Sequence, residues 1–484
     1  MPEAHLHVLK PAPLITFIIC LAALVAAYFT YGKYLESLAD IDPSRPTPCE
    51  RLADGVDYIR MPRWRVFLIQ LLNIAGTGPI FGAILGACFG PVAFLWITLG
   101  GIFFGAMHDF FSGVMIVRDD GRSLPEVLGD FLGNGVRQGV RWFSIVLLVL
   151  VGTVFISSPA ALLHNLVGAV SVGAWVWIIL LYYILATVLP VDKVIGRLYP
   201  IFGAALIFMA LGLLGVLLFG EYTIPELNFH NYQADPEAVP IIPTLFITIA
   251  CGAISGFHAT QSPLMARCVG NEKECRSVFY GAMISESVVA LIWAAIAMAF
   301  FGGADGLVGA LSANGNNPAW AVDAISRSTL GQLGAVLAIL GVVAAPITSG
   351  DTAFRSARLV ISDMFGIEQR TLWKRFAICL PLFAVGYWLT TINFDVLWRY
   401  FAWSNQTLAT VTLWAIYIWL CHRGKNPWVA FVPAVVMTFI VSSYVFISGQ
   451  FVGMGAEWPA YALGGVVTVA AALVAFRAMK KKTA

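Results

Sequence analysis

Charged residues are scarce in this chain of 484 residues, at 12%, whereas soluble domains carry roughly 25%. Hydrophobic residues make up 59% of the sequence. Apolar runs close to the ~20 residues that cross a bilayer follow one another along its whole length. No stretch is both polar enough and long enough for a separate soluble domain. The sequence therefore predicts an all-α polytopic membrane protein that sits in a lipid bilayer.

Motifs of enzymes and of nucleic-acid-binding proteins are also missing. There is no HExxH, GxSxG or Walker loop, and Asp351 has no clear partner aspartate for intramembrane proteolysis. The eight cysteines show neither a disulfide framework nor metal-ligand spacing, and the basic residues form no stripe. We therefore expect no enzyme activity, no cofactor, no metal and no nucleic-acid partner. An intramembrane hydrolase is the rival hypothesis from another class.

The apolar runs predict about thirteen transmembrane helices. They cover residues 13–31, 66–90, 91–117, 142–163, 174–191, 198–219, 240–266, 278–302, 332–351, 376–391, 396–420, 428–447 and 459–476. The first run exceeds the ~7–15 residues of a signal-peptide core, so we interpret it as an uncleaved helix. Counted in alternate connections, Lys and Arg divide 26 to 2, with Arg399 left near a helix start. The positive-inside rule then places the N-terminus outside and the C-terminus in the cytoplasm.

Two of the predicted helices are interrupted near mid-depth, where secondary transporters often bind substrates and ions. The first contains Asn73-Ile74-Ala75-Gly76-Thr77-Gly78-Pro79. Proline suits the start of a new half-helix, and exposed amides from Gly78 onward would attract a carboxylate. In the second we expect Ser255–Gln261 to be unwound, with Ser262 as N-cap and Pro263 as the restart. The plainer alternative, small residues that only permit close helix packing, explains two matching breaks less well.

The breaks lie five predicted helices apart. Because five is odd, the two sets of five helices that begin at the breaks have opposite orientations in the membrane. The sequence thus predicts a 5+5 inverted repeat with one extra N-terminal and two extra C-terminal helices. The segments are an N-terminal helix with a cytoplasmic loop (1–65), a first repeat (66–219), an extracytoplasmic linker (220–239), a second repeat (240–420) and two helices with a basic tail (421–484).

The candidate site residues follow from these breaks and from the rarity of ionisable groups in hydrocarbon, where such groups are functional by default. The substrate-binding candidates are Asn73, Gly76, Thr77, Gly78, Ser255, Gly256, His258 and Gln261. The candidates for ion coupling or gating are His108, Asp109, Glu286, Thr348, Ser349, Asp351, Asp395 and Arg399.

Some of these residues also have plainer interpretations. Asp351 and Arg355 have the i, i+4 spacing of a stabilising helix ion pair. Asp395 and Arg399 repeat that spacing, and a salt bridge there would be either an outer gate or a clamp. The imidazole of His108 would be held by Asp109 or by a carbonyl at the helix end.

The sequence resembles the carbon starvation A family of bacterial transporters. The matching segments are 75–79 (AGTGP), 105–110 (GAMHDF), 118–124 (RDDGRSL), 250–258 (ACGAISGFH) and 404–406 (SNQ). The resemblance implies a fold similar to that of the amino acid, polyamine and organocation (LeuT-like) transporters, in the bacterial inner membrane. It also implies ion-coupled symport of a peptide or pyruvate as the small-molecule substrate.

The chain looks like a short member of that family, lacking its extra C-terminal helices, and residues 348–355 follow the family pattern only in part. The coupling ion implied is H⁺, with Na⁺ as the alternative, because Thr348 and Ser349 match positions whose hydroxyls ligate sodium in related transporters. A channel, or a nutrient sensor without transport, is the competing function. The sequence leaves the oligomeric state open.

Overall fold

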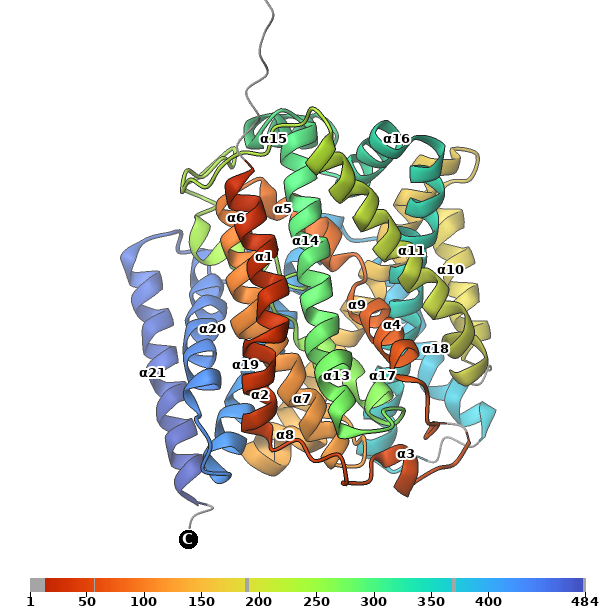
Figure 1. The fold of residues 1–484 in the computed structure, drawn as a ribbon, viewed down its shortest axis with the longest axis vertical. Helices are drawn as coiled ribbons and strands as arrows, with labels where there is room; N and C mark the ends of the chain where they lie inside the picture. The colour runs from red at the N-terminus through yellow and green to blue at the C-terminus, as the bar shows by residue number, and fades with distance from the viewer. Residues whose placement is uncertain (1–13, 56, 188–190, 368–370, 482–484) are drawn as a thin grey trace, which may run out of the picture.

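The structure, a computed structural model, describes residues 14–481 apart from 56, 188–190 and 368–370, and the described residues form helices without any β-strand (Figure 1). The first half contains α1 (Ile15–Phe29), α2 (Tyr31–Ala39), α3 (Pro48–Arg51), α4 (Arg63–Ile74), η1 (Gly78–Gly82), α5 (Ala83–Ala87), α6 (Val92–Leu95), η2 (Trp96–Ala106), α7 (Met107–Arg118), α8 (Leu124–Leu132), α9 (Asn134–Val167), α10 (Val172–Ala186) and α11 (Val191–Phe219). The second contains η3 (Ile241–Leu245), α12 (Phe246–Thr248), α13 (Gly256–Ala266), η4 (Glu272–Glu274), η5 (Arg276–Tyr280), α14 (Gly281–Phe300), α15 (Ala304–Ala313), α16 (Pro318–Leu337), η6 (Ala338–Val343), α17 (Ala344–Phe365), α18 (Leu372–Leu389), α19 (Phe394–His422), α20 (Trp428–Ile447) and α21 (Trp458–Lys481).

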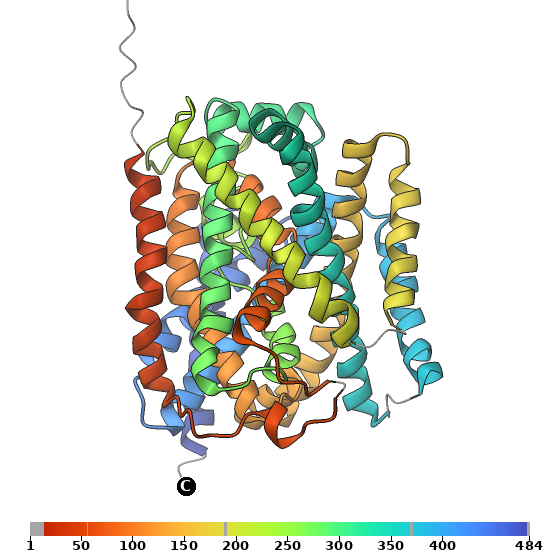
Figure 2. The ribbon, with the colours of Figure 1, turned by 45° about the vertical axis from the view of Figure 1, so that its right-hand side comes forward.

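The all-helical membrane architecture predicted from the sequence is confirmed. Eight described helices are long and apolar enough to cross a membrane, or nine if the bent pair Arg63–Ile74 and Gly78–Ala87 forms one span. The count of about thirteen is consistent with this but stays a prediction. The helices form one upright bundle in which α4, α13 and α14 lie near the middle and α21 lies on the outside (Figures 1 and 2).

Basic residues from alternate connections meet at the end of the bundle where α3 and α8 lie, which is the lower end in Figure 1. Glu272 accepts hydrogen bonds from Arg45 at 2.7 Å and from Arg118 at 3.0 Å. Lys425 donates to Asp40 at 2.7 Å, and this hydrogen bond lowers the pKa of the Asp40 carboxyl. We call this the basic end and the opposite one the α15 end. Lys10 and Arg370 lie outside the described residues.

The first helix break forms where the sequence predicts it. The helix α4 ends at Ile74, and after residues 75–77 the chain restarts as η1 and α5, with a bend of 56° between the two halves. Pro79 lies in the first turn of the new half-helix, where its missing N–H costs no hydrogen bond. Gly76 packs against the Phe155 ring so closely that an added Cβ would lie 2.4 Å from it.

The second break exists, but the prediction that Ser255–Gln261 would be unwound is wrong. The helix α12 ends at Thr248 and α13 begins at Gly256, so the unwound stretch is 249–255. Ser255 is the extended residue before α13, whereas His258 and Gln261 lie inside it. Pro263, expected as the restart, is also inside α13.

The early start of α13 has a cause outside the local sequence. The Asn405 side chain on α19 accepts hydrogen bonds from the Phe257 N–H at 2.7 Å and the Ser255 hydroxyl at 3.0 Å. This satisfies N-terminal donors that a local cap would otherwise serve. The predicted cap, Ser262, instead donates to the His258 carbonyl at 3.1 Å.

The two breaks touch each other. A Cβ built on Gly78 in the first would lie 2.3 Å from the Cβ of Cys251 in the second. A Cβ on Gly82 would lie 3.1 Å from the Thr248 carbonyl oxygen at the end of α12. The backbone of the first interrupted span therefore packs directly against the Cys251 side chain and the Thr248 carbonyl of the second, which only glycine permits at so short a distance.

Candidate functional site

Four buried ionisable side chains meet beside the second break. His108 and Asp109 belong to α7, His258 to α13 and Glu286 to α14. Asp109 Oδ1 lies 2.8 Å from His108 Nδ1, and Asp109 Oδ2 lies 2.8 Å from His258 Nδ1. On the far side of the same ring, His258 Nε2 lies 3.4 Å from Glu286 Oε2. All four residues are fully buried. We call Asp109, His258 and Glu286, with His108, the His–carboxylate cluster.

The geometry of the cluster defines where a proton can be held. An ionised carboxylate only accepts hydrogen bonds, so both Nδ1 atoms facing Asp109 carry hydrogen when Asp109 is charged. The Nε2 atom of His258 and the Glu286 carboxylate then face each other, with the Cys251 thiol beside them. One proton between these two groups can reside on either the imidazole or the carboxyl. The arrangement therefore suits a site that gains and loses a proton.

The same region contains a set of donor atoms that could hold a metal. The Cys251 thiol, a ring nitrogen of His258 and a Glu286 oxygen lie within 4.8 Å of one another. The hydrogen bond from His258 to Asp109 would orient the ring, as carboxylates do for metal-bound histidines. These are three donors, one fewer than the four ligands of a structural zinc site.

Several polar side chains around the first break are buried without a partner. The side-chain amides of Gln70 and Asn73 and the hydroxyl of Thr77 have no hydrogen-bond partner among the described residues. The side-chain oxygen Oε1 of Gln261 on α13 has none either. Each such group costs ~1–3 kcal/mol if it stays unsatisfied. A polar ligand or water held between α4 and α13 would remove that cost. Sequence reasoning identified Asn73, Thr77 and Gln261 but missed Gln70, which lies one helical turn before Asn73.

Asp351 does not join the His–carboxylate cluster. It forms a buried i, i+4 ion pair with Arg355 at 3.1 Å, and the Tyr199 hydroxyl lies 3.4 Å from it. The Arg355 guanidinium also donates to the Ala186 carbonyl at 2.6 Å. The Asp351–Arg355 pair therefore links α17 to α10 through Arg355 and to α11 through Asp351, and the helix ion pair expected from the spacing is present.

The two hydroxyls suggested for sodium binding donate their hydrogens to backbone carbonyls. Thr348 donates to the Ala345 carbonyl at 2.8 Å. Ser349 donates at 2.9 Å to the Leu72 carbonyl of α4, just before the first break. Ser349 thus ties α17 to the interrupted helix.

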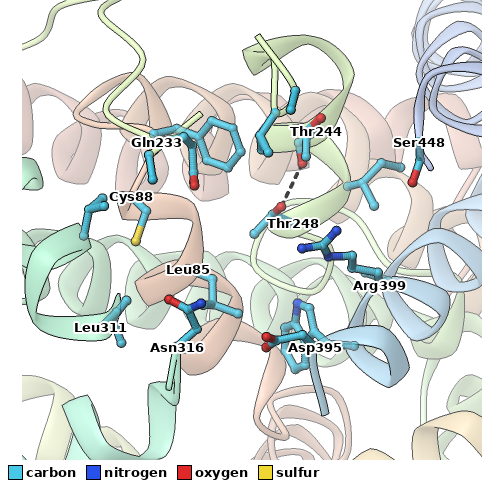
Figure 3. A pocket seen from close by; sticks show the side chains of 18 of the residues that line it. Leu85, Cys88, Gln233, Thr244, Thr248, Leu311, Asn316, Asp395, Arg399 and Ser448 are labelled. Atoms are coloured by element: carbon cyan, nitrogen blue, oxygen red, sulfur yellow. Dashed lines mark hydrogen bonds between the residues drawn. The ribbon is translucent and has the colours of Figure 1, made fainter. Parts of the chain in front are cut away.

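At the α15 end the structure contains a cavity of about 270 Å³. It is lined by the end of α5, the segment 233–248, α15 and the start of α19, and Figure 3 shows Asp395 and Arg399 among its side chains. The salt bridge suggested by their spacing is not formed: within the described residues neither side chain makes a hydrogen bond or an ion pair.

Aromatic rings connect this cavity to the first break. Trp398 lines the cavity and packs on Phe401, with ring centroids 5.3 Å apart. Phe401 packs on Phe155 at 6.2 Å, and the Phe155 ring covers Gly76. Sequence reasoning did not select these residues, because aromatic side chains are ordinary in apolar spans.

Interrupted helices that meet at mid-bundle, beside buried ionisable groups, are typical of secondary transporters. This chain belongs to the carbon starvation protein CstA family, whose family model matches residues 12–172, 158–327 and 319–443. The resemblance drawn from the sequence motifs is thereby confirmed.

The similar proteins are named as membrane proteins or transporters. An uncharacterized membrane protein of Haemophilus influenzae is 45% identical over 356 residues, covering 63% of this chain and 96% of that protein. The peptide transporter CstA of Escherichia coli is 27% identical, covering 84% of this chain and 77% of that protein. The pyruvate/proton symporter BtsT of the same organism is 28% identical, covering 55% and 46%. The names agree with a transporter and not an enzyme.

The similar solved structures support the same fold. MhsT in complex with L-phenylalanine has a TM-score of 0.53 at 14% identity, covering 86% of this chain and 99% of that one. An Eremococcus coleocola manganese transporter has a TM-score of 0.51 at 16% identity, covering 88% and 97%. The chain therefore has the LeuT-like fold that the resemblance implied.

Proposed function

We propose that this chain imports a small carboxylate-bearing nutrient, a peptide or pyruvate, by alternating access and that H⁺ drives the import. The substrate centre is the pair of touching helix breaks, and the His–carboxylate cluster carries the coupling proton. The chain lies in a bacterial inner membrane with its basic end in the cytoplasm. Residues 66–219 and 240–420 are the two inverted repeats that rock against each other.

The observation that carries this proposal is the His258 ring between Asp109 and Glu286. Ionisable groups buried among apolar helices are costly and are kept where they transfer or bind ions. His258 is on the half-helix that begins directly after the second break, so a change in its protonation acts on the backbone nearest the substrate. A name among the relatives, pyruvate/proton symporter, agrees with H⁺.

The unpartnered amides at the first break support the placement of the substrate. The side-chain polar atoms of Gln70, Asn73 and Thr77 are buried and have no hydrogen-bond partner among the described residues. The N–H groups at the start of η1 add the positive end of a half-helix, which favours a carboxylate. A small anion bound here would reach the His–carboxylate cluster through Gln261 and His258 on α13. Protonation of the cluster and binding of the anion would then favour each other.

Uptake into proteoliposomes tests the proposal. Purified protein is reconstituted, and accumulation of labelled pyruvate and of labelled L-alanyl-L-alanine is measured with a H⁺ gradient alone, a Na⁺ gradient alone and neither. We expect accumulation of at least one of the two under the H⁺ gradient, with loss when an uncoupler is added. Accumulation under the Na⁺ gradient alone would mean that the coupling ion is Na⁺ and not H⁺. Thr348 and Ser349 would then be the candidate ligands.

Other outcomes would assign the competing functions. Equilibration of solute without accumulation under either gradient would indicate a channel. Binding of a solute to the purified protein without any flux would indicate a sensor. Release of a cleaved product from the dipeptide would indicate a hydrolase. Each of these results would contradict the proposed symport.

A further inference from the structure

The cavity at the α15 end is lined by two opposite charges that attract each other but form no salt bridge. Asp395 and Arg399 lie four residues apart near the start of α19, about 6 Å along the helix axis. At this spacing the two side chains of a helix can form an ion pair. Here they do not, and neither has a hydrogen-bond or ion-pair partner in the described part of the chain. Both line the cavity instead (Figure 3).

The rest of the lining is suited to a small polar molecule. In Figure 3 the Arg399 guanidinium extends toward Thr248, while Asp395 lies on the side of Asn316. Gln233 contributes an amide from the segment that crosses the cavity. At about 270 Å³, the cavity is slightly below the ~300–1,000 Å³ of sites for drug-sized ligands. It can hold an amino acid or a short peptide.

The two charges discriminate between the candidate nutrients. A guanidinium pairs with a carboxylate through two parallel hydrogen bonds, and both pyruvate and a peptide offer that carboxylate. Asp395 can pair with a positively charged group, which a peptide or amino acid supplies through its α-ammonium group. Pyruvate has no cation, so Asp395 would repel it and stay unpaired.

We propose that this cavity is an outer binding site for zwitterions, in which Arg399 binds the carboxylate and Asp395 the ammonium group of an amino acid or short peptide. This inference rests on the proposed transport function and names its substrate class. Thr248 is the last residue of α12 before the second break, so the site lies directly outside the substrate centre. Solute held here would enter the centre when the Trp398 and Phe401 rings separate from Phe155.

Calorimetric binding to the purified wild-type protein tests the proposal. The probes are L-alanyl-L-alanine, its N-acetyl derivative without the cation, its C-terminal amide without the carboxylate, and pyruvate. We expect the unmodified dipeptide to bind about tenfold or more tightly than each of the other three, because each of them leaves one charge unpaired. Equal affinity for the dipeptide and the N-acetyl derivative would remove Asp395 from the site and overturn the proposal.

Variants separate charge recognition from folding. Asp395→Asn should weaken binding of the dipeptide but not of the N-acetyl derivative. Arg399→Gln should weaken binding of the dipeptide but not of the C-terminal amide. Arg399→Lys should restore part of the affinity. Arg327→Gln is the control, because Arg327 is a partly exposed arginine paired with Asp323 in α16, away from the cavity. Equal loss with Arg327→Gln would contradict the assignment.

Flux measurements distinguish failure of this inference from failure of the proposed function. If Asp395→Asn and Arg399→Gln take up the dipeptide like the wild type under a H⁺ gradient, the outer site is wrong and the transport proposal stands. If wild-type protein binds the dipeptide with the expected charge selectivity but accumulates nothing, the outer site stands and the symport is wrong.

Discussion

The Asn405 side chain accepts a hydrogen bond from the Phe257 N–H across 148 residues of sequence. A residue of α19 thereby caps the half-helix that carries His258. The same amide donates to the Cys251 sulfur at 3.4 Å, so Asn405 contacts both the unwound stretch 249–255 and the start of α13. We expect the position of the second break to depend on this side chain.

Replacing Asn405 by Leu should destabilise the protein by ~0.5–2 kcal/mol, the range for loss of a helix N-cap, and should strongly reduce uptake. Asn405→Asp keeps an acceptor oxygen at the helix N-terminus and should retain more uptake than Asn405→Leu. Thr412→Val is the control, because Thr412 is buried on α19 but bonds only to the Leu408 carbonyl of its own helix. Thermal unfolding and uptake are measured together, and equal behaviour of Asn405→Leu and Thr412→Val would refute the cap.

Replacing Glu286 by Gln should abolish accumulation driven by a H⁺ gradient while leaving exchange of internal for external substrate largely intact. The reason is that a glutamine amide cannot take the proton that Glu286 shares with His258, although it fills the same space. Counterflow with no gradient isolates the exchange reaction. If both reactions fall to the same extent, Glu286 binds substrate or supports the fold, and the proton assignment is wrong.

Asp351→Asn should behave differently, lowering stability together with both reactions. Removal of one partner from a buried ion pair costs ~3–5 kcal/mol, and the Asp351–Arg355 pair is almost fully buried. Replacing both residues, as in Asp351→Leu with Arg355→Met, should recover much of that stability. The partly exposed pair Asp323–Arg327 has the same i, i+4 spacing, so Asp323→Asn serves as the control and should cost only ~0–1 kcal/mol. Selective loss of H⁺-driven accumulation in Asp351→Asn would instead move the coupling site to α17.

A methyl group at Gly78 should be enough to impair transport. In Gly78→Ala the new Cβ would overlap Cys251, and overpacking of this kind costs ~1–3 kcal/mol. The second substitution Cys251→Gly removes the overlapping atoms and should restore uptake to the Gly78→Ala protein. Gly309→Ala in α15, where nothing lies within 4 Å, is the control. Normal uptake in Gly78→Ala would contradict the prediction, because it would mean that transport does not need the close contact between Gly78 and Cys251.

Cys251→Ala should keep H⁺-driven uptake, and treatment of the wild type with EDTA should leave uptake unchanged. The Cys251 thiol lies beside the His258 ring but takes no part in the hydrogen bond that joins His258 to Asp109, and a proton needs no thiol ligand. Loss of uptake with both EDTA and Cys251→Ala, restored by one divalent metal in the wild type alone, would mean that a cation occupies the three donors.

The parts of the site that could be predicted from sequence are those with local causes. Gly76, Gly78 and Pro79 interrupt α4 by their own backbone properties, so the first break lies at the residues that the sequence predicts. The limits of the second break could not be predicted in this way, because Asn405 caps α13 from another helix and overrides the local signal of Ser262 and Pro263.

Tertiary contacts explain the remaining differences. The contact of Asp109 with His258 joins α7 to α13, and no spacing in the sequence indicates it. Asp395 and Arg399 have the spacing of a helix ion pair, as Asp351 and Arg355 do. The latter pair is enclosed between helices and forms, whereas the former opens on a cavity and does not. Spacing alone cannot distinguish these two environments.

The contact of Gly78 with Cys251 has a mechanical consequence. Because the Cys251 side chain fills the space against Gly78, a displacement of either interrupted span has to be accommodated by the other. In the proposed transport cycle, a tilt of α4 would press on the stretch that carries Cys251 and would have to be matched by α12. This contact would then oppose opening of the bundle at both faces at once.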